Sequence, residues 1–83
     1  MPTDFDHRLS RIENEVGEEI HHTTRATLTT LLNSVSTDVG DRIVEFVQHK
    51  YEQEGEYPTI KDVKDYANNQ LDVPSEQLPR YNA

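Results

Sequence analysis

The chain has 83 residues, with 16 Asp and Glu against 8 Lys and Arg, and a formal net charge of −8 at pH 7. Only 33% of its residues are hydrophobic, and it has no Cys, which excludes disulfides and thiolate metal sites. It has no run of about 18 apolar residues and no basic, apolar leader at its start, so we expect no membrane contact and a cytoplasmic location.

Residues 4–34 are predicted to form one long amphipathic helix. Apolar residues recur there every three or four positions, while most of the intervening residues are polar or charged. Gly17 and the β-branched threonines that follow weaken a helix. The sequence therefore predicts a long N-terminal helix with a kink near residues 17–24.

An apolar stripe of this length is hard for the remainder of so short a chain to cover. We therefore interpret residues 1–35 as a helical oligomerisation arm. The predicted partner is a second copy of the chain, with a dimer as the first expectation, or another helical or basic protein. The predicted interface residues are Phe5, Leu9, Ile12, Val16, Ile20, Leu28, Leu31 and Val35.

Residues 36–83 are predicted to form a compact unit of two to three helices. Thr37 is a favourable N-cap for a helix over about 38–54, and Gly55 suits the left-handed position after its last turn. The inward residues of this helix are predicted to be Val39, Ile43, Val44, Phe46, Val47 and Tyr51.

A further helix is predicted over about 60–70. Thr59 precedes it as N-cap, and Asp62 stands three residues later, as in a capping box. Beyond it, Pro74 and Pro79 permit only a short turn. The predicted fold class is therefore all-α: a long N-terminal helix followed by a small helical domain.

The stretch from Thr59 to Tyr81 resembles a helix-turn-helix motif. If Ala67 is its first buried position, the next apolar residues fall at the offsets where such motifs bury side chains between their two helices: Leu71, Val73, Leu78 and Tyr81. The resemblance implies a dimeric DNA-binding regulator. The residues that would contact DNA are Lys61, Lys64, Asn68 and Arg80.

Three residues depart from the helix-turn-helix pattern. Asn68 replaces a small residue at the helix crossing, and Asp72 replaces the usual turn glycine. Pro79 would fall inside the recognition helix, where proline costs about 3 kcal/mol. These departures favour an ordinary three-helix packing unit over a DNA-binding motif.

The charge of the chain also disfavours nucleic acid, because phosphate-binding proteins normally carry a basic face. The scarcity of Lys and the abundance of acids and Thr resemble proteins of salt-loving archaea and their viruses. In molar salt, screening acts over about 3 Å, and the charge would no longer prevent contact with DNA. A viral origin would place the protein in the virion.

Little in the sequence indicates a catalytic or metal-binding site. Two overlapping Glu-x-x-His spacings lie between Glu18 and His22 and resemble those of di-iron bundles, but Ile20 occupies the apolar stripe there, so the histidines should face outward. No glycine-rich phosphate loop or nucleophile motif is present. We predict no metal, cofactor or catalytic residue, and a non-enzymatic interaction or assembly module, with the helix-turn-helix regulator as the alternative.

Overall fold

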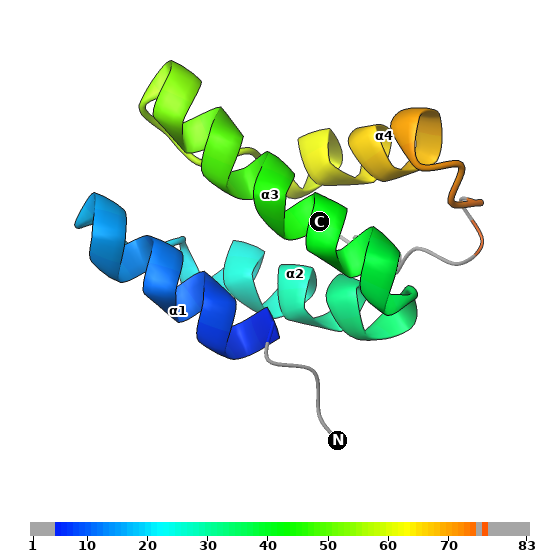
Figure 1. Cartoon of the computed structure of the whole chain (residues 1–83), viewed down its shortest axis with the longest axis horizontal. Helices are drawn as coiled ribbons and strands as arrows, with labels where there is room; N and C mark the ends of the chain where they lie inside the picture. The colour runs from blue at the N-terminus through cyan, green and yellow to red at the C-terminus, as the bar shows by residue number, and fades with distance from the viewer. Residues whose placement is uncertain (1–4, 75, 77–83) are drawn as a thin grey trace.

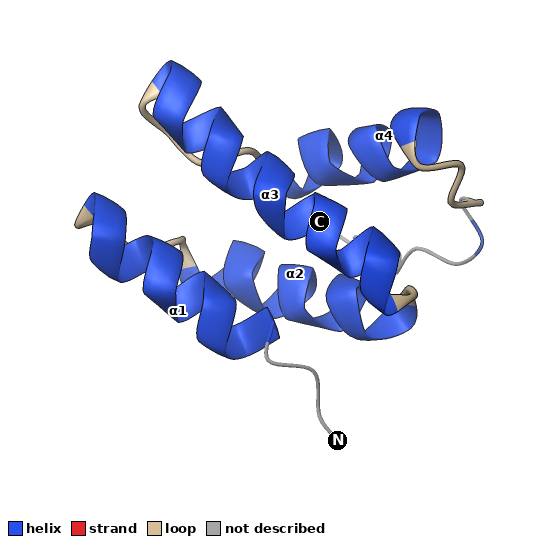
Figure 2. Cartoon of the chain, viewed as in Figure 1, coloured by secondary structure: helices blue, strands red, loops and turns tan. Residues whose placement is uncertain are grey.

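The computed structural model describes residues 5–74 and 76, and these residues form four helices and no strand (Figures 1 and 2). The all-α class is confirmed. The longest helix, α3, packs against each of the others. The bounds of the helices are α1 Phe5–Val16, α2 His22–Ser34, α3 Thr37–Glu54 and α4 Ile60–Gln70.

The prediction of a single long N-terminal helix is wrong. The helix ends at Val16, and the chain turns back over residues 17–21 so that α2 runs beside α1 in the opposite direction (Figure 1). Gly17 adopts the left-handed conformation, with φ +79°, and its N–H still donates to the Glu13 carbonyl at 2.9 Å. Glycine takes this conformation without a Cβ penalty, so the predicted kink becomes a complete reversal.

The threonine-rich segment is helical, and its hydroxyl groups bond within the helix. Four of them donate to the carbonyl four residues earlier, at 2.9–3.1 Å: Thr27, Thr29, Thr30 and Ser34. These bonds satisfy the polar atoms of side chains that otherwise favour turns or strands. At the start of α2, the His21 imidazole accepts from the Thr23 N–H at 3.4 Å.

The second half of the chain follows its local signals closely. Ser36, and not the predicted Thr37, is the N-cap of α3, so this helix begins one residue early. Gly55 ends it with φ +77°, as predicted. The capping box of α4 is confirmed, because the Asp62 N–H donates to the Thr59 hydroxyl at 3.1 Å and the Thr59 N–H donates to the Asp62 carboxylate at 3.2 Å.

One hydrophobic core joins residues from both halves of the chain. The expectation that the chain could not cover its own apolar stripe is wrong, because α2 and α3 pack over α1. Six of the eight predicted interface residues are buried within this single chain, and Val16 and Val35 are partly buried against the core. The six are Phe5, Leu9, Ile12, Ile20, Leu28 and Leu31. The first segment is therefore part of the bundle and does not project from it as an arm.

α1 and α3 lie close together at their N-terminal ends. The Phe5 ring lies directly over the buried Gly40, where an added Cβ would lie within 2.7 Å of the ring atom Cε2. One turn later, the Arg8 guanidinium forms an ion pair with Asp41 of α3. The absence of a side chain at Gly40 therefore sets how near these two helices lie.

Candidate functional site

The residues predicted to contact DNA are only partly brought together. Lys61 is exposed on α4 and Lys64 is partly buried, with Asp62 and Asp65 exposed on the same helix. The Asn68 side-chain amide donates to the Val73 carbonyl at 3.0 Å and so helps to shape the turn after α4. Arg80 lies outside the described residues, as do Leu78, Pro79 and Tyr81.

The turn that follows α4 has a distinctive backbone. Asp72 adopts φ +57°, the left-handed region that Asp tolerates better than most residues. The N–H groups of Leu71 and Val73 both donate to the Ala67 carbonyl, at 3.2 and 3.0 Å, and Ala67 and Val73 are buried. Asp72 thus takes the conformation that the turn glycine supplies in a helix-turn-helix motif.

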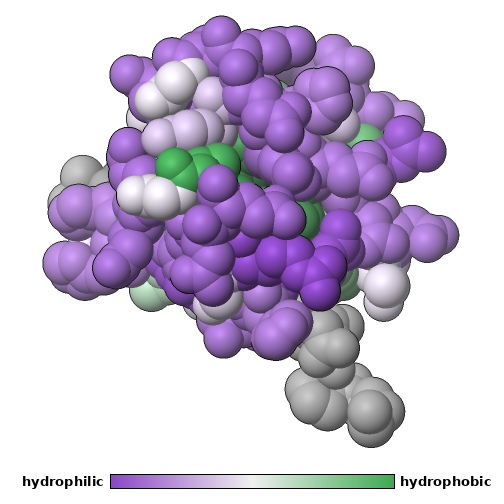
Figure 3. Space-filling view, turned by 60° about the vertical axis from the view of Figure 1, so that its left-hand side comes forward, coloured by the Kyte–Doolittle hydropathy of each residue, from purple (hydrophilic) through white to green (hydrophobic). Residues whose placement is uncertain are grey.

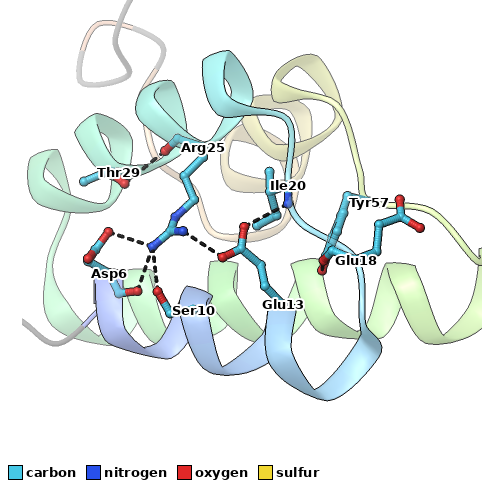
Figure 4. A network of polar contacts seen from close by, with 8 residues as sticks. All are labelled: Asp6, Ser10, Glu13, Glu18, Ile20, Arg25, Thr29 and Tyr57. Carbon is cyan, nitrogen blue, oxygen red and sulfur yellow. Dashed lines mark hydrogen bonds and ion pairs between the residues drawn. The ribbon is translucent and has the colours of Figure 1, made fainter.

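A polar network joins α1 to α2 around Arg25 (Figure 4). Its Nη1 donates to Glu13 Oε1 at 2.8 Å, and its Nη2 donates to Asp6 Oδ1 at 2.7 Å. Nη2 also donates to the Asp6 carbonyl at 2.9 Å and the Ser10 hydroxyl at 3.1 Å. The other Glu13 oxygen accepts from the Ile20 N–H at 2.8 Å and so fixes the turn between the helices.

Sequence reasoning missed this network. Arg25 lies 12 and 19 positions from Glu13 and Asp6, so the residues meet only because the chain reverses at Gly17. The Arg25 side chain is 22% exposed and that of Glu13 is 12% exposed. Removing one partner of an ion pair shielded to this extent costs more than breaking a fully exposed pair, because the remaining charge is left without compensation.

Replacing Arg25 with Met is expected to lower the free energy of unfolding by on the order of 1–2 kcal/mol, because the shielded Glu13 carboxylate loses its charged partner. Arg11→Met, at an exposed position of α1, is the matched control and should change the stability by less than about 0.5 kcal/mol. Urea unfolding followed by circular dichroism measures both variants. Equal effects of the two substitutions would contradict a stabilising role for the network.

The C-terminal ends of α1 and α3 lie at the same end of the bundle (Figure 1). Two tyrosines join them: the Tyr57 hydroxyl donates to the Glu18 carbonyl at 2.6 Å, and the Tyr51 hydroxyl donates to the Glu18 carboxylate at 3.0 Å. Six exposed carboxylates lie in the last turn of α1 or α3 or within three residues of the end of that helix, and we call them the acidic end: Glu15, Glu18, Glu19, Glu52, Glu54 and Glu56.

The acidic end is electrostatically unbalanced. Neither α1 nor α3 has a basic residue in its last turn, although the C-terminus of a helix carries partial negative charge. Within the described residues 13–24 and 48–58, Lys50 is the sole Lys or Arg, and the nearby Arg25, which lines one pocket with Glu19, is paired with Asp6 and Glu13. The Lys50 ammonium pairs with Glu54 at 2.8 Å, and this hydrogen bond raises the pKa of Lys50. Most of the negative charge therefore remains available to solvent or a partner.

Figure 3, in which the left-hand side of Figure 1 comes forward, shows a mostly hydrophilic surface with a small apolar area. The His21 and His22 rings stack at 4.8 Å, and both residues are exposed. Among the described residues, no three His, Cys, Asp or Glu side chains are placed to hold a metal ion together.

Burial raises the pKa of Tyr57 to about 12, with a further contribution from the negative charge of Glu13. An unfolded tyrosine titrates near 10, so the Tyr57 contribution to stability is present below pH 10 and is lost as the pH rises towards 12. We expect Tyr57→Phe to flatten the fall in stability across this interval. Tyr66→Phe, which preserves the stacking ring beside Phe46, is the control and should retain the fall. Thermal unfolding at a series of pH values measures the difference.

Within the described part of the chain, no helix combines the length and the apolar character needed to cross a membrane. Comparison of the chain with models of known protein families, with curated proteins and with solved structures found no match.

Proposed function

We propose that this protein is a non-enzymatic helical binding module that presents its acidic end to a basic protein partner. The observation that carries the proposal is the convergence of two helix C-termini and six exposed carboxylates beside a single lysine. A surface of one sign attracts a partner of the opposite sign, speeds their encounter and fixes their relative orientation.

The acidic end is also held in a defined shape. The Tyr51 and Tyr57 rings pack together, with centroids 4.7 Å apart, and both hydroxyls bond to Glu18. These bonds link the connection between α1 and α2 to the end of α3. A surface ordered before binding loses less conformational entropy when its partner docks, which favours specific recognition over diffuse attraction.

The proposal is tested by titration with a fluorescent Lys- and Arg-rich helical peptide in moderate salt. The variant Glu15→Gln, Glu52→Gln, Glu56→Gln removes three charges from the acidic end. The control Glu45→Gln, Asp65→Asn, Glu76→Gln removes three exposed charges elsewhere. We expect the first variant to weaken binding by about tenfold, equivalent to about 1.4 kcal/mol, and the control by much less. Equal losses would show attraction by net charge alone, and absence of binding by the wild type would also overturn the proposal.

A helix-turn-helix DNA-binding regulator is the second candidate function. It is favoured by the left-handed Asp72 and the burial of Ala67 and Val73, which match the turn of such motifs. Lys61 and Lys64 would then bind phosphates. Binding would appear as a salt-sensitive shift in the electrophoretic mobility of duplex DNA, and Lys61→Glu with Lys64→Glu should abolish it. Loss of each lysine–phosphate contact should reduce the slope of log K against the logarithm of salt concentration by about 0.9. We expect no shift by the wild type in moderate salt, because its net charge of −8 opposes approach.

The acidic surface also supports the proposal that the protein works in high salt. Repulsion among the 16 acidic side chains is screened as salt rises. We therefore expect the melting temperature and the helicity to increase as KCl is raised from dilute to molar concentration, as measured by circular dichroism. A constant or falling melting temperature would contradict adaptation to salt.

A further inference from the structure

We propose that two copies of this chain form a dimer by exchanging α1, with residues 17–21 as the hinge. In the exchanged form the hinge straightens, α1 and α2 become one continuous helix, and each α1 packs on the α2 and α3 of the other copy. The partner surface is therefore the site that α1 already occupies within one chain. The hinge includes Glu18 and Glu19 of the acidic end, so exchange would alter that end, but its test is self-association and does not require a basic partner.

The sequence of the hinge is compatible with either form. The reversal depends on one left-handed residue, Gly17, and no proline lies between Phe5 and Ser34. A straight helix would carry the four-residue spacing of the stripe through the hinge, with the residues Val16, Ile20, Thr24, Leu28 and Leu32. Short hinges between elements of this kind are where domain exchange arises.

The interactions that hold α1 in place can form equally well between two copies. The Phe5 ring on Gly40, the Arg8–Asp41 ion pair and the Arg25 network all connect α1 to residues after the hinge. Exchange keeps each of these interactions, with the same partner residue supplied by the other copy. Figure 1 shows α1 at one side of the bundle, so it can leave while α3 stays packed on α4.

Exchange breaks only the hydrogen bonds of the hinge itself. They are the hydrogen bond from the Ile20 N–H to Glu13, the bond from the Thr23 N–H to the His21 imidazole at the start of α2, and the two tyrosine bonds to Glu18. Against them, the dimer forms the backbone hydrogen bonds of a continuous helix across the hinge. Because the two forms differ mainly at these residues, protein concentration and single substitutions in the hinge should decide between them.

The first test uses the absence of cysteine from the chain. An Arg8→Cys variant and an Asp41→Cys variant are mixed at high concentration, incubated, and treated with a short bismaleimide cross-linker. Exchange brings Cys from one copy beside Cys from the other, so we expect covalent heterodimers well above the level of a control mixture of Arg11→Cys with Asp65→Cys. Equal cross-linking of the two mixtures would overturn the proposal.

The second test changes the hinge and measures association by sedimentation velocity. Gly17→Ala disfavours the left-handed conformation and favours helix, so it should increase the dimer association constant at least tenfold. Insertion of Gly-Gly-Ser after Glu19 lengthens the hinge and should make the chain monomeric, with its helicity retained. A Gly17→Ala variant that remains folded and monomeric, or an insertion that leaves association unchanged, would contradict exchange.

Discussion

Leu9→Asp combined with Ile12→Asp is expected to unfold the chain. Leu9 is 0% exposed and Ile12 is 3% exposed, and both lie in the core shared by the four helices. Each substitution forfeits about 1.5–3 kcal/mol of apolar burial and places a carboxylate among apolar side chains. A domain of this size has a stability of roughly 5–15 kcal/mol, so the two changes together should exhaust it. Loss of the helical far-ultraviolet circular dichroism signal measures the outcome.

The control places two aspartates on the outer face of the same helix. Arg11→Asp with Asn14→Asp alters two exposed positions of α1 and should leave the fold intact. The comparison separates residues that the fold requires from residues that only self-association requires. If the Leu9 and Ile12 double variant stayed helical and lost only its self-association, these residues would belong to an interface, as the apolar spacing alone predicts.

Gly40→Ala is expected to destabilise the protein, although alanine is the better helix former by about 1 kcal/mol. The added Cβ would come within 2.7 Å of the Phe5 ring, so the ring or α1 would have to shift. Overpacking of this kind costs roughly 1–3 kcal/mol beyond the gain in helix propensity. Chemical denaturation gives the free energy of unfolding for the wild type and the variant.

Phe5→Leu is the second single variant of a double-mutant cycle with Gly40→Ala. The smaller side chain makes room for the new methyl group, so the double variant should be more stable than the sum of the single effects predicts. Additive effects would show that the Phe5 ring does not limit the size of the side chain at position 40. A stabilising Gly40→Ala on its own would have the same meaning.

The second half of the chain was predictable because its signals are local. A Thr59 hydroxyl and an Asp62 carboxylate cap α4 within one turn of helix, and Gly55 ends α3 through its own backbone freedom. Such features need no distant partner.

The acidic end differs in this respect. Its charges are readable from two stretches of sequence more than 30 residues apart, but the packing of α1 against α3 brings these stretches together, and the tyrosine bonds to Glu18 then link them.

By itself, the sequence determined the helical class, the local caps of α4, and which side chains must leave water. Amphipathic spacing requires burial of a stripe, but the hydrophobic effect has no direction and does not specify the covering surface. The tertiary structure decided that surface. The apolar spacing is compatible with a helix running through Gly17 and with a reversal at Gly17, and the reversal is favoured within one chain because α1 then meets α3 at Gly40 and Arg25 reaches Glu13. Interactions between residues far apart in sequence therefore chose between two arrangements that the local pattern permits equally.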